Sequence, residues 1–325
     1  MTVVLILGGT GWLSGHVARG WIAAGAEVTC LARGGRPAPE GATLVEADRA
    51  EPGAYDVVAQ RDWDEVVDIS SDAGHVASAC AALAARAAHW TYVSTLSVYA
   101  ESDVEGADES AALLEPARPD DEYDYGRAKV AAEASVREAL GERAAIVRPG
   151  LIVGPGDPSD RFGYWVARFA AAADGPVLVP ETQGRSAQVI DVRDLADFVV
   201  EVGRHRWTGI ANAIGDSVPL GDLLADARAA AGHTGDLRHA DDEWLQAHDV
   251  RFWMGPRSLP LWLPADMNGF STRTNAVYRG AGGGLRPLTD TLRDTLADER
   301  ERGLDRERRS GLTREEELAV IAELP

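Results

Sequence analysis

The stretch Val3-Val-Leu-Ile-Leu-Gly-Gly-Thr-Gly-Trp-Leu-Ser-Gly15 opens the chain and decides its fold. The five apolar residues from Val3 to Leu7 show no polar alternation, which is typical of a strand buried on both faces of a parallel sheet. Three glycines fall within the next four positions, and apolar residues at helical spacing begin at Trp12. Glycines let phosphates approach the backbone closely, and a helix N-terminus offers free N–H groups. The stretch therefore predicts a diphosphate-binding turn between a strand and a helix.

The remainder of the first half alternates strand-like and helix-like segments, as repeated β-α-β units do. The further predicted strands are 27–32, 43–47, 65–69, 90–94 and 144–147, and the further predicted helices are 74–88 and 124–140. Such repeats predict an α/β fold of the Rossmann type, a doubly wound parallel sheet that binds ligands at the carboxyl ends of its strands.

Beyond Gly150 the alternation is less regular. We expect residues 1–153 to form the dinucleotide-binding part, completed by about 186–206 with a strand at 188–192 and a helix at 194–202. Residues 154–185 and 207–325 are expected to form a smaller substrate-binding portion, packed over the edge of the sheet. The charged run from Glu299 to Arg309 is expected to be solvated.

Charge and composition exclude several classes of protein. The chain has 325 residues and a formal net charge of −20, which argues against binding to nucleic acid or to anionic membranes. No apolar run approaches the roughly 18 residues of a membrane span, and no secretory signal is evident, so a cytoplasmic location is expected. Cys30 and Cys80 lie in apolar segments and are predicted to be buried free thiols. The seven histidines show no ligand spacing, and no metal site is predicted.

Tyr125-Gly-Arg-Ala-Lys129 places a phenol and an ammonium group four residues apart, on one face of a predicted helix. A cation beside a phenol lowers the phenol's pKa from about 10 toward neutrality, so that Tyr125 could exchange a proton during catalysis. Lys129 is the only lysine in the chain, and the planar, forked head of arginine would be a poor substitute for it. Tyr123 has Arg127 at the same spacing and is set aside. The alternative is a surface Tyr/Lys pair without function.

Hydroxyl groups follow the strand predicted at 90–94. Ser94, Thr95 and Ser97 come at its carboxyl end, where a doubly wound sheet places reactive groups. Thr95 or Ser97 could donate a hydrogen bond to a substrate oxygen that gains negative charge. Capping of a turn is the other explanation for such residues.

Five motifs in this order resemble the extended short-chain dehydrogenase/reductases, the group named for NAD-dependent epimerases and dehydratases. They span nearly the whole chain, at Gly8–Leu13, Ser94–Tyr99, Tyr125–Lys129, Arg148–Gly156 and Val189–Ala196. The resemblance implies that Tyr125 is the catalytic acid/base, that Lys129 holds the nicotinamide ribose and tunes Tyr125, and that Thr95 fills the family's Ser/Thr role. It also implies a monomer or a homodimer, whose interface would be formed by the helices beginning near Gly74 and Asp124.

The same resemblance, together with the glycine turn, gives the residues expected to bind the cofactor. They are Gly8, Thr10, Gly11, Trp12, Leu13, Arg33, Arg36, Asp48, Ser70, Tyr125, Lys129 and Pro149. Within this set, Asp48 would meet the adenine, unless it is only a loop aspartate. Ser70 would line the dinucleotide, unless it caps the next helix, and Pro149 would lie along the nicotinamide.

Three positions depart from the family pattern. Ser14 stands where the third glycine of the usual spacing falls. Arg33, with Arg36, follows the second strand where an acidic residue would bind the ribose of NAD, so we expect NADP rather than NAD unless these arginines form only a solvated turn. Ala187 occupies the place of an arginine that grips a diphosphate in many nucleotide-sugar enzymes, and Arg185 lies two residues away.

Four tryptophans in the second half could form the floor of an aromatic pocket, although large aromatic residues more often belong to the core. They are Trp165, Trp244, Trp253 and Trp262.

These observations support three hypotheses. The leading one is an NADP(H)-dependent oxidoreductase that reduces a carbonyl of a small-molecule substrate, or oxidises the matching alcohol, with Thr95, Tyr125 and Lys129 as its catalytic set. The alternative is a nucleotide-sugar epimerase or dehydratase with a retained dinucleotide. The third is a non-catalytic dinucleotide-sensing scaffold, against which the acidic charge and the Tyr125/Lys129 pair argue.

Overall fold

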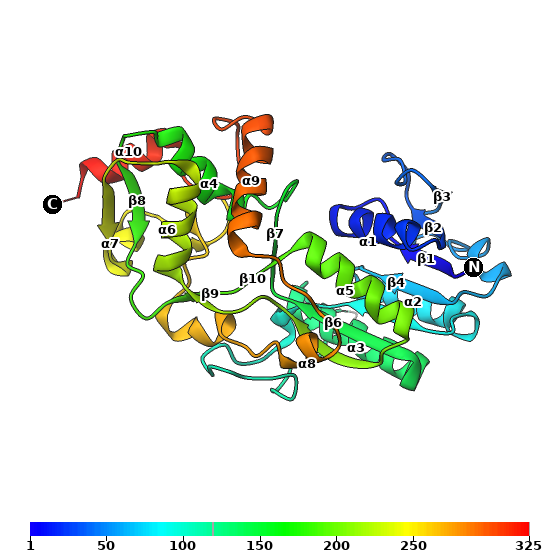
Figure 1. The fold of residues 1–325 in the computed structure, drawn as a ribbon. Helices are drawn as coiled ribbons and strands as arrows, with labels where there is room; N and C mark the ends of the chain where they lie inside the picture. The colour runs from blue at the N-terminus through cyan, green and yellow to red at the C-terminus, as the bar shows by residue number, and fades with distance from the viewer. Residues whose placement is uncertain (119, 325) are drawn as a thin grey trace.

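The computed structural model describes residues 1–118 and 120–324. Figure 1 shows a larger part built around a central sheet, which contains the N-terminus, and a smaller, mainly helical part that contains the C-terminal helix. The chain crosses between the two parts several times, so both are assembled from segments that are distant in sequence.

The central sheet has seven strands in the described part of the chain, in the order β11-β6-β5-β4-β1-β2-β3, and every neighbouring pair is parallel. Its strands are β1 (Val3–Leu7), β2 (Glu27–Ala32), β3 (Ala42–Glu46), β4 (Glu65–Asp68), β5 (Trp90–Val93), β6 (Ala144–Pro149) and β11 (Gly209–Ala213). From β1 the chain adds β2 and β3 on one side of the sheet, and from β4 it adds β5, β6 and finally β11 on the other side. This reversal of direction confirms the predicted doubly wound α/β fold. The carboxyl ends of the strands therefore share one edge.

Helices cover both faces of this sheet (Figure 1). On one face α1 (Trp12–Ala23) packs against α5 (Val192–His205), and on the other α2 (Ala73–Leu83) packs against α3 (Tyr125–Leu140). The side chains of β1 are divided between the two layers, since Val4 and Ile6 belong to the core under α1 and Leu5 and Leu7 to the core under α2. This explains why the opening strand is apolar at every position.

The smaller part surrounds its own apolar core. Strand β8 (Val177–Pro180) pairs with β13 (Leu237–Ala240), and α4 (Arg161–Ala172) packs against α6 (Leu220–Ala231) and α9 (Leu288–Arg302). The remaining elements are β7 (Leu151–Val153), β9 (Ser186–Ala187), β10 (Val189–Asp191), β12 (Val218–Pro219), β14 (Arg251–Trp253), β15 (Ser258–Pro260), α7 (Asp242–Ala247), α8 (Ala276–Gly280) and α10 (Arg314–Ala322), with short 3-10 turns at 58–60, 84–86, 96–98, 141–143 and 265–271.

Two details differ from the sequence-based expectations. The sheet takes its seventh strand from β11, within the segment 207–325 that we assigned to the smaller portion. The run Gly-Ile-Ala-Asn-Ala gives little sign of a strand in the sequence because Ile210 is its single β-branched residue. Glu299 is 1% exposed rather than solvated. It forms ion pairs with three arginines, of which Arg306 and Arg308 lie beyond the end of α9.

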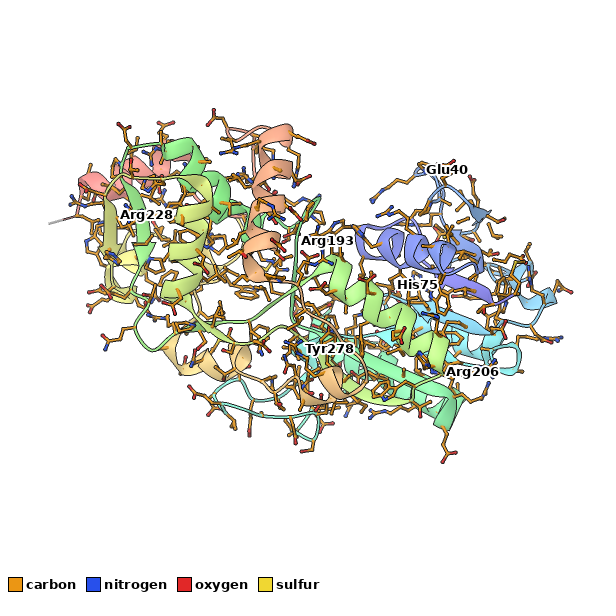
Figure 2. All side chains as sticks on the ribbon, in the orientation of Figure 1. Glu40, His75, Arg193, Arg206, Arg228 and Tyr278 are labelled. Atoms are coloured by element: carbon orange, nitrogen blue, oxygen red, sulfur yellow. The ribbon has the colours of Figure 1, made fainter. Side chains whose placement is uncertain are left out.

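Ion pairs join the two parts at the start of α5. Arg193 donates hydrogen bonds of 2.7 Å to Asp191, just before the helix, and of 2.7 Å to Asp294 on α9. Figure 2 shows Arg193 at this junction. Thr291, also on α9, donates to the same Asp191 carboxylate at 2.8 Å. The smaller part is thereby held beside the carboxyl edge of the sheet.

Candidate active site

The turn between β1 and α1 forms a backbone cradle. Gly8 has a φ of 84°, a conformation that favours glycine. Gly9 lies so close to β2 that a Cβ atom there would be 2.5 Å from the Cys30 Sγ atom. Ser14 replaces the family's third glycine without filling the cradle, because its Oγ donates 2.7 Å to the Gly8 carbonyl and accepts 2.9 Å from the Gly11 N–H.

The first turn of α1 supplies the groups that an anion needs. The N–H groups of Trp12 and Leu13 have no acceptor within the helix, and the dipole places partial positive charge there. Such an N-terminus above a glycine turn fits the diphosphate of a dinucleotide. Backbone N–H groups and the small residues of the turn are sufficient to bind the diphosphate, so no basic side chain is needed at this point.

A cavity of about 540 Å³ opens over this turn. We call it the dinucleotide cavity. Its walls include most of the residues predicted to bind the adenine half and the phosphates, namely Gly8, Thr10, Gly11, Trp12, Leu13, Arg33, Arg36, Asp48 and Ser70. The structure therefore gathers around one cavity side chains that follow four different strands.

A second cavity of about 560 Å³ lies at the ends of β5 and β6. We call it the catalytic cavity. It is lined by Thr95, Tyr125, Lys129 and Pro149, together with residues of the smaller part. Trp12, Leu13, Ile69 and Ser71 line both cavities, so the two adjoin along one cleft. A dinucleotide in this cleft would have its phosphates at the glycine turn and its other end beside Tyr125.

Tyr125 is the first residue of α3, which Asp124 caps by accepting a 2.7 Å hydrogen bond from the Arg127 N–H. Its side chain is 42% exposed and lines the catalytic cavity. Thr95 lines the same cavity, and its Oγ1 also accepts a 3.2 Å hydrogen bond from the Ser97 N–H. Thr95 thus serves both as a turn cap and as a hydroxyl presented to the cavity.

Lys129 lies one turn further along α3 and is 2% exposed. Its ammonium group donates to the Val93 carbonyl at 2.6 Å and to the Ser70 carbonyl at 2.8 Å. It also lies 4.8 Å from the centre of the Tyr92 ring, a cation–π contact. Burial lowers the pKa of Lys129 to about 8. The two carbonyls and the ring hold this buried cation at the wall of the cavity.

The pKa of Tyr125 differs from the expectation. Partial removal of the phenol from water raises it above its usual value, and the Thr95 hydroxyl and the positive charge of Arg161 offset only part of the increase. We expected Lys129 to bring this pKa toward neutrality. In the protein alone that expectation is wrong, because the Lys129 ammonium is directed to two backbone carbonyls.

A buried ion pair fixes α3 against the sheet. Arg148 on β6 and Glu133 on α3 are both at most 1% exposed, and they form two hydrogen bonds of 2.9 and 2.7 Å. Ser94 donates to the same carboxylate at 2.6 Å, and Arg148 also donates to the Tyr99 hydroxyl at 2.9 Å. This network positions the helix that carries Tyr125 and Lys129 relative to the end of β5.

The remaining predicted residues differ in their exposure and in the groups they contact. Arg33 and Arg36 are exposed at the rim of the dinucleotide cavity. Asp48 accepts a 3.0 Å hydrogen bond from the Ala50 N–H, and its neighbour Arg49 forms a bidentate pair with Asp68 at 2.9 and 2.7 Å. Arg185 is bound to Asp242 and to two backbone carbonyls, and it lines neither cavity.

Three of the four tryptophans are core residues. Trp165 and Trp262 are buried in the core of the smaller part, and Trp244 and Trp253 are partly buried against the same core. Trp253 also lines the catalytic cavity. Both cysteines are free and buried, as predicted.

Sequence reasoning missed the residues that the smaller part brings to the catalytic cavity. They are Asp157, Pro158, Ser159, Arg161, Met254 and Phe270. The turn cluster Gly154-Pro-Gly-Asp-Pro158 was the available signal, since loops that follow the sheet's strands line its ligand site. Within residues 1–118 and 120–324 no group of histidines, cysteines and acids is arranged to hold a metal ion. No helix in that same portion of the chain has the length and apolarity to cross a membrane.

Comparison with solved structures confirms the fold. The structure resembles an NAD-dependent NDP-hexosamine 5,6-dehydratase, TunA, of tunicamycin biosynthesis (TM-score 0.69, 20% identity, 94% of this chain and 100% of that one). It also resembles UDP-N-acetylglucosamine 4-epimerase from Bacillus cereus (0.69, 14%, 94% and 99%). A third relative is UDP-glucose 4-epimerase from Thermus thermophilus, solved with NAD (0.66, 16%, 92% and 99%). No curated protein sequence gives a significant match.

The sequence itself matches one family over more than half of its length. The match covers residues 4–214, which include the glycine turn, Thr95, Tyr125, Lys129 and all seven strands of the sheet except the first residue of β1. The chain therefore belongs to the NAD dependent epimerase/dehydratase family.

Proposed function

We propose that the protein is a nucleotide-sugar epimerase or dehydratase that retains its nicotinamide dinucleotide. In such a reaction a secondary alcohol is oxidised to a ketone, the neighbouring chemistry takes place, and the cofactor returns to its starting state. Family membership favours this reaction over net carbonyl reduction, which was the leading hypothesis from the sequence. The observation that carries the proposal is the shared cleft, which joins the glycine turn to Tyr125 and Thr95.

Each catalytic residue has a distinct role in this proposal. Tyr125, as phenolate, accepts the proton of the substrate hydroxyl and later returns it. Thr95 donates a hydrogen bond to the same oxygen, which carries more negative charge in the transition state than in the bound alcohol. Lys129 is charged and is fixed by hydrogen bonds to two backbone carbonyls, and it supplies positive charge at the wall of the catalytic cavity that Tyr125 and Thr95 also line.

The dinucleotide would be held by the turn residues Gly8, Gly11 and the first turn of α1, and when bound it takes up and returns a hydride. Arg33 and Arg36 line the adenine side of the cleft, and neither forms an ion pair with any residue of the described ranges. Guanidinium groups in that position suit a 2′-phosphate, which supports NADP over NAD in this protein.

Turnover with a limiting cofactor tests the proposal. The protein is mixed with one equivalent of oxidised dinucleotide and an excess of a nucleotide sugar from a panel of UDP-sugars, and proton NMR follows the sugar. We expect many equivalents to be converted without net reduction of the cofactor. Conversion that stops at one equivalent, or that requires continuous supply of reduced cofactor, would instead support the reductase.

A further inference from the structure

Arg161 stands out among the residues of the catalytic cavity. It is the first residue of α4 and reaches the cavity from the smaller part. Its guanidinium lies 5.3 Å from the centre of the Trp253 ring, and its Nε donates to the Ser159 Oγ at 3.2 Å. The side chain is therefore held in one place by a ring on one side and a hydroxyl at its base.

The outer nitrogens of this guanidinium remain free. Across residues 1–118 and 120–324, no carboxylate forms an ion pair with Arg161, and its two Nη atoms have no hydrogen-bond partner. The acidic residue in the lining of the same cavity is Asp157. Its two oxygens accept from the Ser159 N–H at 2.8 Å and from the Ser159 hydroxyl at 2.9 Å, so Ser159 lies between the two charges.

Leaving a half-buried guanidinium unpaired is costly. Partial removal from water lowers the pKa of Arg161, and the negative charges of Asp157 and of an ionised Tyr125 offset only part of this decrease. Buried or half-buried arginines normally face carboxylates or phosphates, to which their planar fork donates two parallel hydrogen bonds. Among the residues of the smaller part that line the cavity, Trp253, Met254 and Phe270 are apolar and offer no acceptor. An anionic group of a ligand would complete this wall.

We infer that the substrate carries a carboxylate next to the reacting carbon, and that the free fork of Arg161 binds it. This inference rests on the proposed function and names the substrate class within it, a nucleotide-linked sugar acid. The carboxylate is assigned to the reacting end because Arg161 lines the same cavity as Tyr125 and Thr95. The diphosphate of a nucleotide sugar would lie beyond the sugar ring.

Two probes that differ in one group test the inference. UDP-glucuronic acid has a carboxylate where UDP-glucose has a hydroxymethyl group, and calorimetry measures their binding to the protein saturated with oxidised dinucleotide. We expect the wild-type protein to bind the acid about tenfold or more tightly, as a charge-assisted bidentate contact implies. Arg161→Gln should lose this preference while keeping its affinity for UDP-glucose, and Arg161→Lys should keep part of it.

Arg86→Gln is the matched control, because Arg86 is an exposed arginine that lines neither cavity. It should leave both affinities unchanged. Equal binding of the two probes by the wild-type protein would overturn the inference. So would an equal loss of both affinities in Arg161→Gln, since that pattern would place the diphosphate on Arg161.

The same samples separate this inference from the proposed reaction. A clear preference for the acid without any conversion by NMR would support the role of Arg161 and contradict the epimerase or dehydratase reaction. Conversion of UDP-glucose with no preference for the acid would do the reverse. Binding of neither probe would overturn both.

Discussion

The ammonium group of Lys129 donates a 2.6 Å hydrogen bond to the carbonyl oxygen of Val93, the last residue of β5. A second hydrogen bond, of 2.8 Å, reaches Ser70, just beyond the end of β4. The solitary lysine of the chain thus connects α3 to the ends of two neighbouring strands at the cavity wall. Lys129 therefore fixes α3 relative to these strand ends and also supplies a positive charge to the site.

Lys129 should make stability depend on pH in the alkaline range. Its folded pKa of about 8 lies below its ordinary value of 10.5. Between these values the unfolded chain binds a proton that the folded chain does not, so the free energy of unfolding rises with pH across this window. Relative to Lys129→Met, the cofactor-free wild type should gain roughly 3 kcal/mol between pH 8 and 10.5. Urea denaturation at several pH values measures this, and a constant difference would contradict it.

Gly9→Ala should damage both folding and dinucleotide binding. The added Cβ would lie 2.5 Å from the Cys30 Sγ atom, so the turn must move away from β2. We expect a loss of about 1–3 kcal/mol in the free energy of unfolding, and weaker binding of the dinucleotide. Gly15→Ala is the control, since its Cβ would make only an ordinary 3.5 Å contact with Arg19. Equal stability of the two variants would show that the close approach is unimportant.

Removing the Glu133 carboxylate should unfold much of the site. Glu133→Ala leaves Arg148 buried without its partner, which costs about 3–5 kcal/mol in comparable buried pairs. Thermal and urea denaturation measure the loss. Glu27→Ala removes a carboxylate from the exposed pair with Arg61, and it should change stability little. Similar effects of the two substitutions would mean that the buried network does not hold α3 in place.

The dinucleotide-binding half of the site follows from local sequence. The apolar run of β1, its glycines and the start of α1 are contiguous, so periodicity alone predicts the turn. Tyr125 and Lys129 were recognisable because a spacing of four places side chains on one helix face. Ser14, at the position of the family's third glycine, fits into the turn because its Oγ forms hydrogen bonds with the backbone of Gly8 and Gly11.

The substrate half of the site could not be predicted in the same way. Arg161 and Trp253 meet across a cavity although they are far apart in the chain, and no local pattern brings them together. Glu299 lies in a charged run whose composition indicates exposure, yet arginines from outside the helix bury it. In both cases tertiary contacts of long range decide the outcome. Such contacts cannot be predicted from the local propensities of the residues.

Arg33 should select between the two dinucleotides. Arg33→Ser should weaken NADP binding roughly tenfold to a hundredfold, because a charge-assisted contact to the 2′-phosphate is lost, and should leave NAD binding nearly unchanged. Calorimetry on the purified protein measures both affinities. Arg19→Ser, an exposed arginine on α1, is the control. If the wild-type protein binds NAD more tightly than NADP, the preference proposed from Arg33 and Arg36 is wrong.

The central claim is that Tyr125 exchanges a proton beside a bound dinucleotide. In the protein alone partial removal from water keeps the pKa of Tyr125 above its usual value. A bound oxidised nicotinamide is positively charged, and a cation beside a phenol favours phenolate. The direct measurement is a pH titration of phenolate absorbance, with and without oxidised dinucleotide, in the wild type and in Tyr125→Phe. We predict one tyrosine whose pKa falls on binding in the wild type and is missing from the variant. Identical titrations of the two proteins with the dinucleotide bound would contradict the claim.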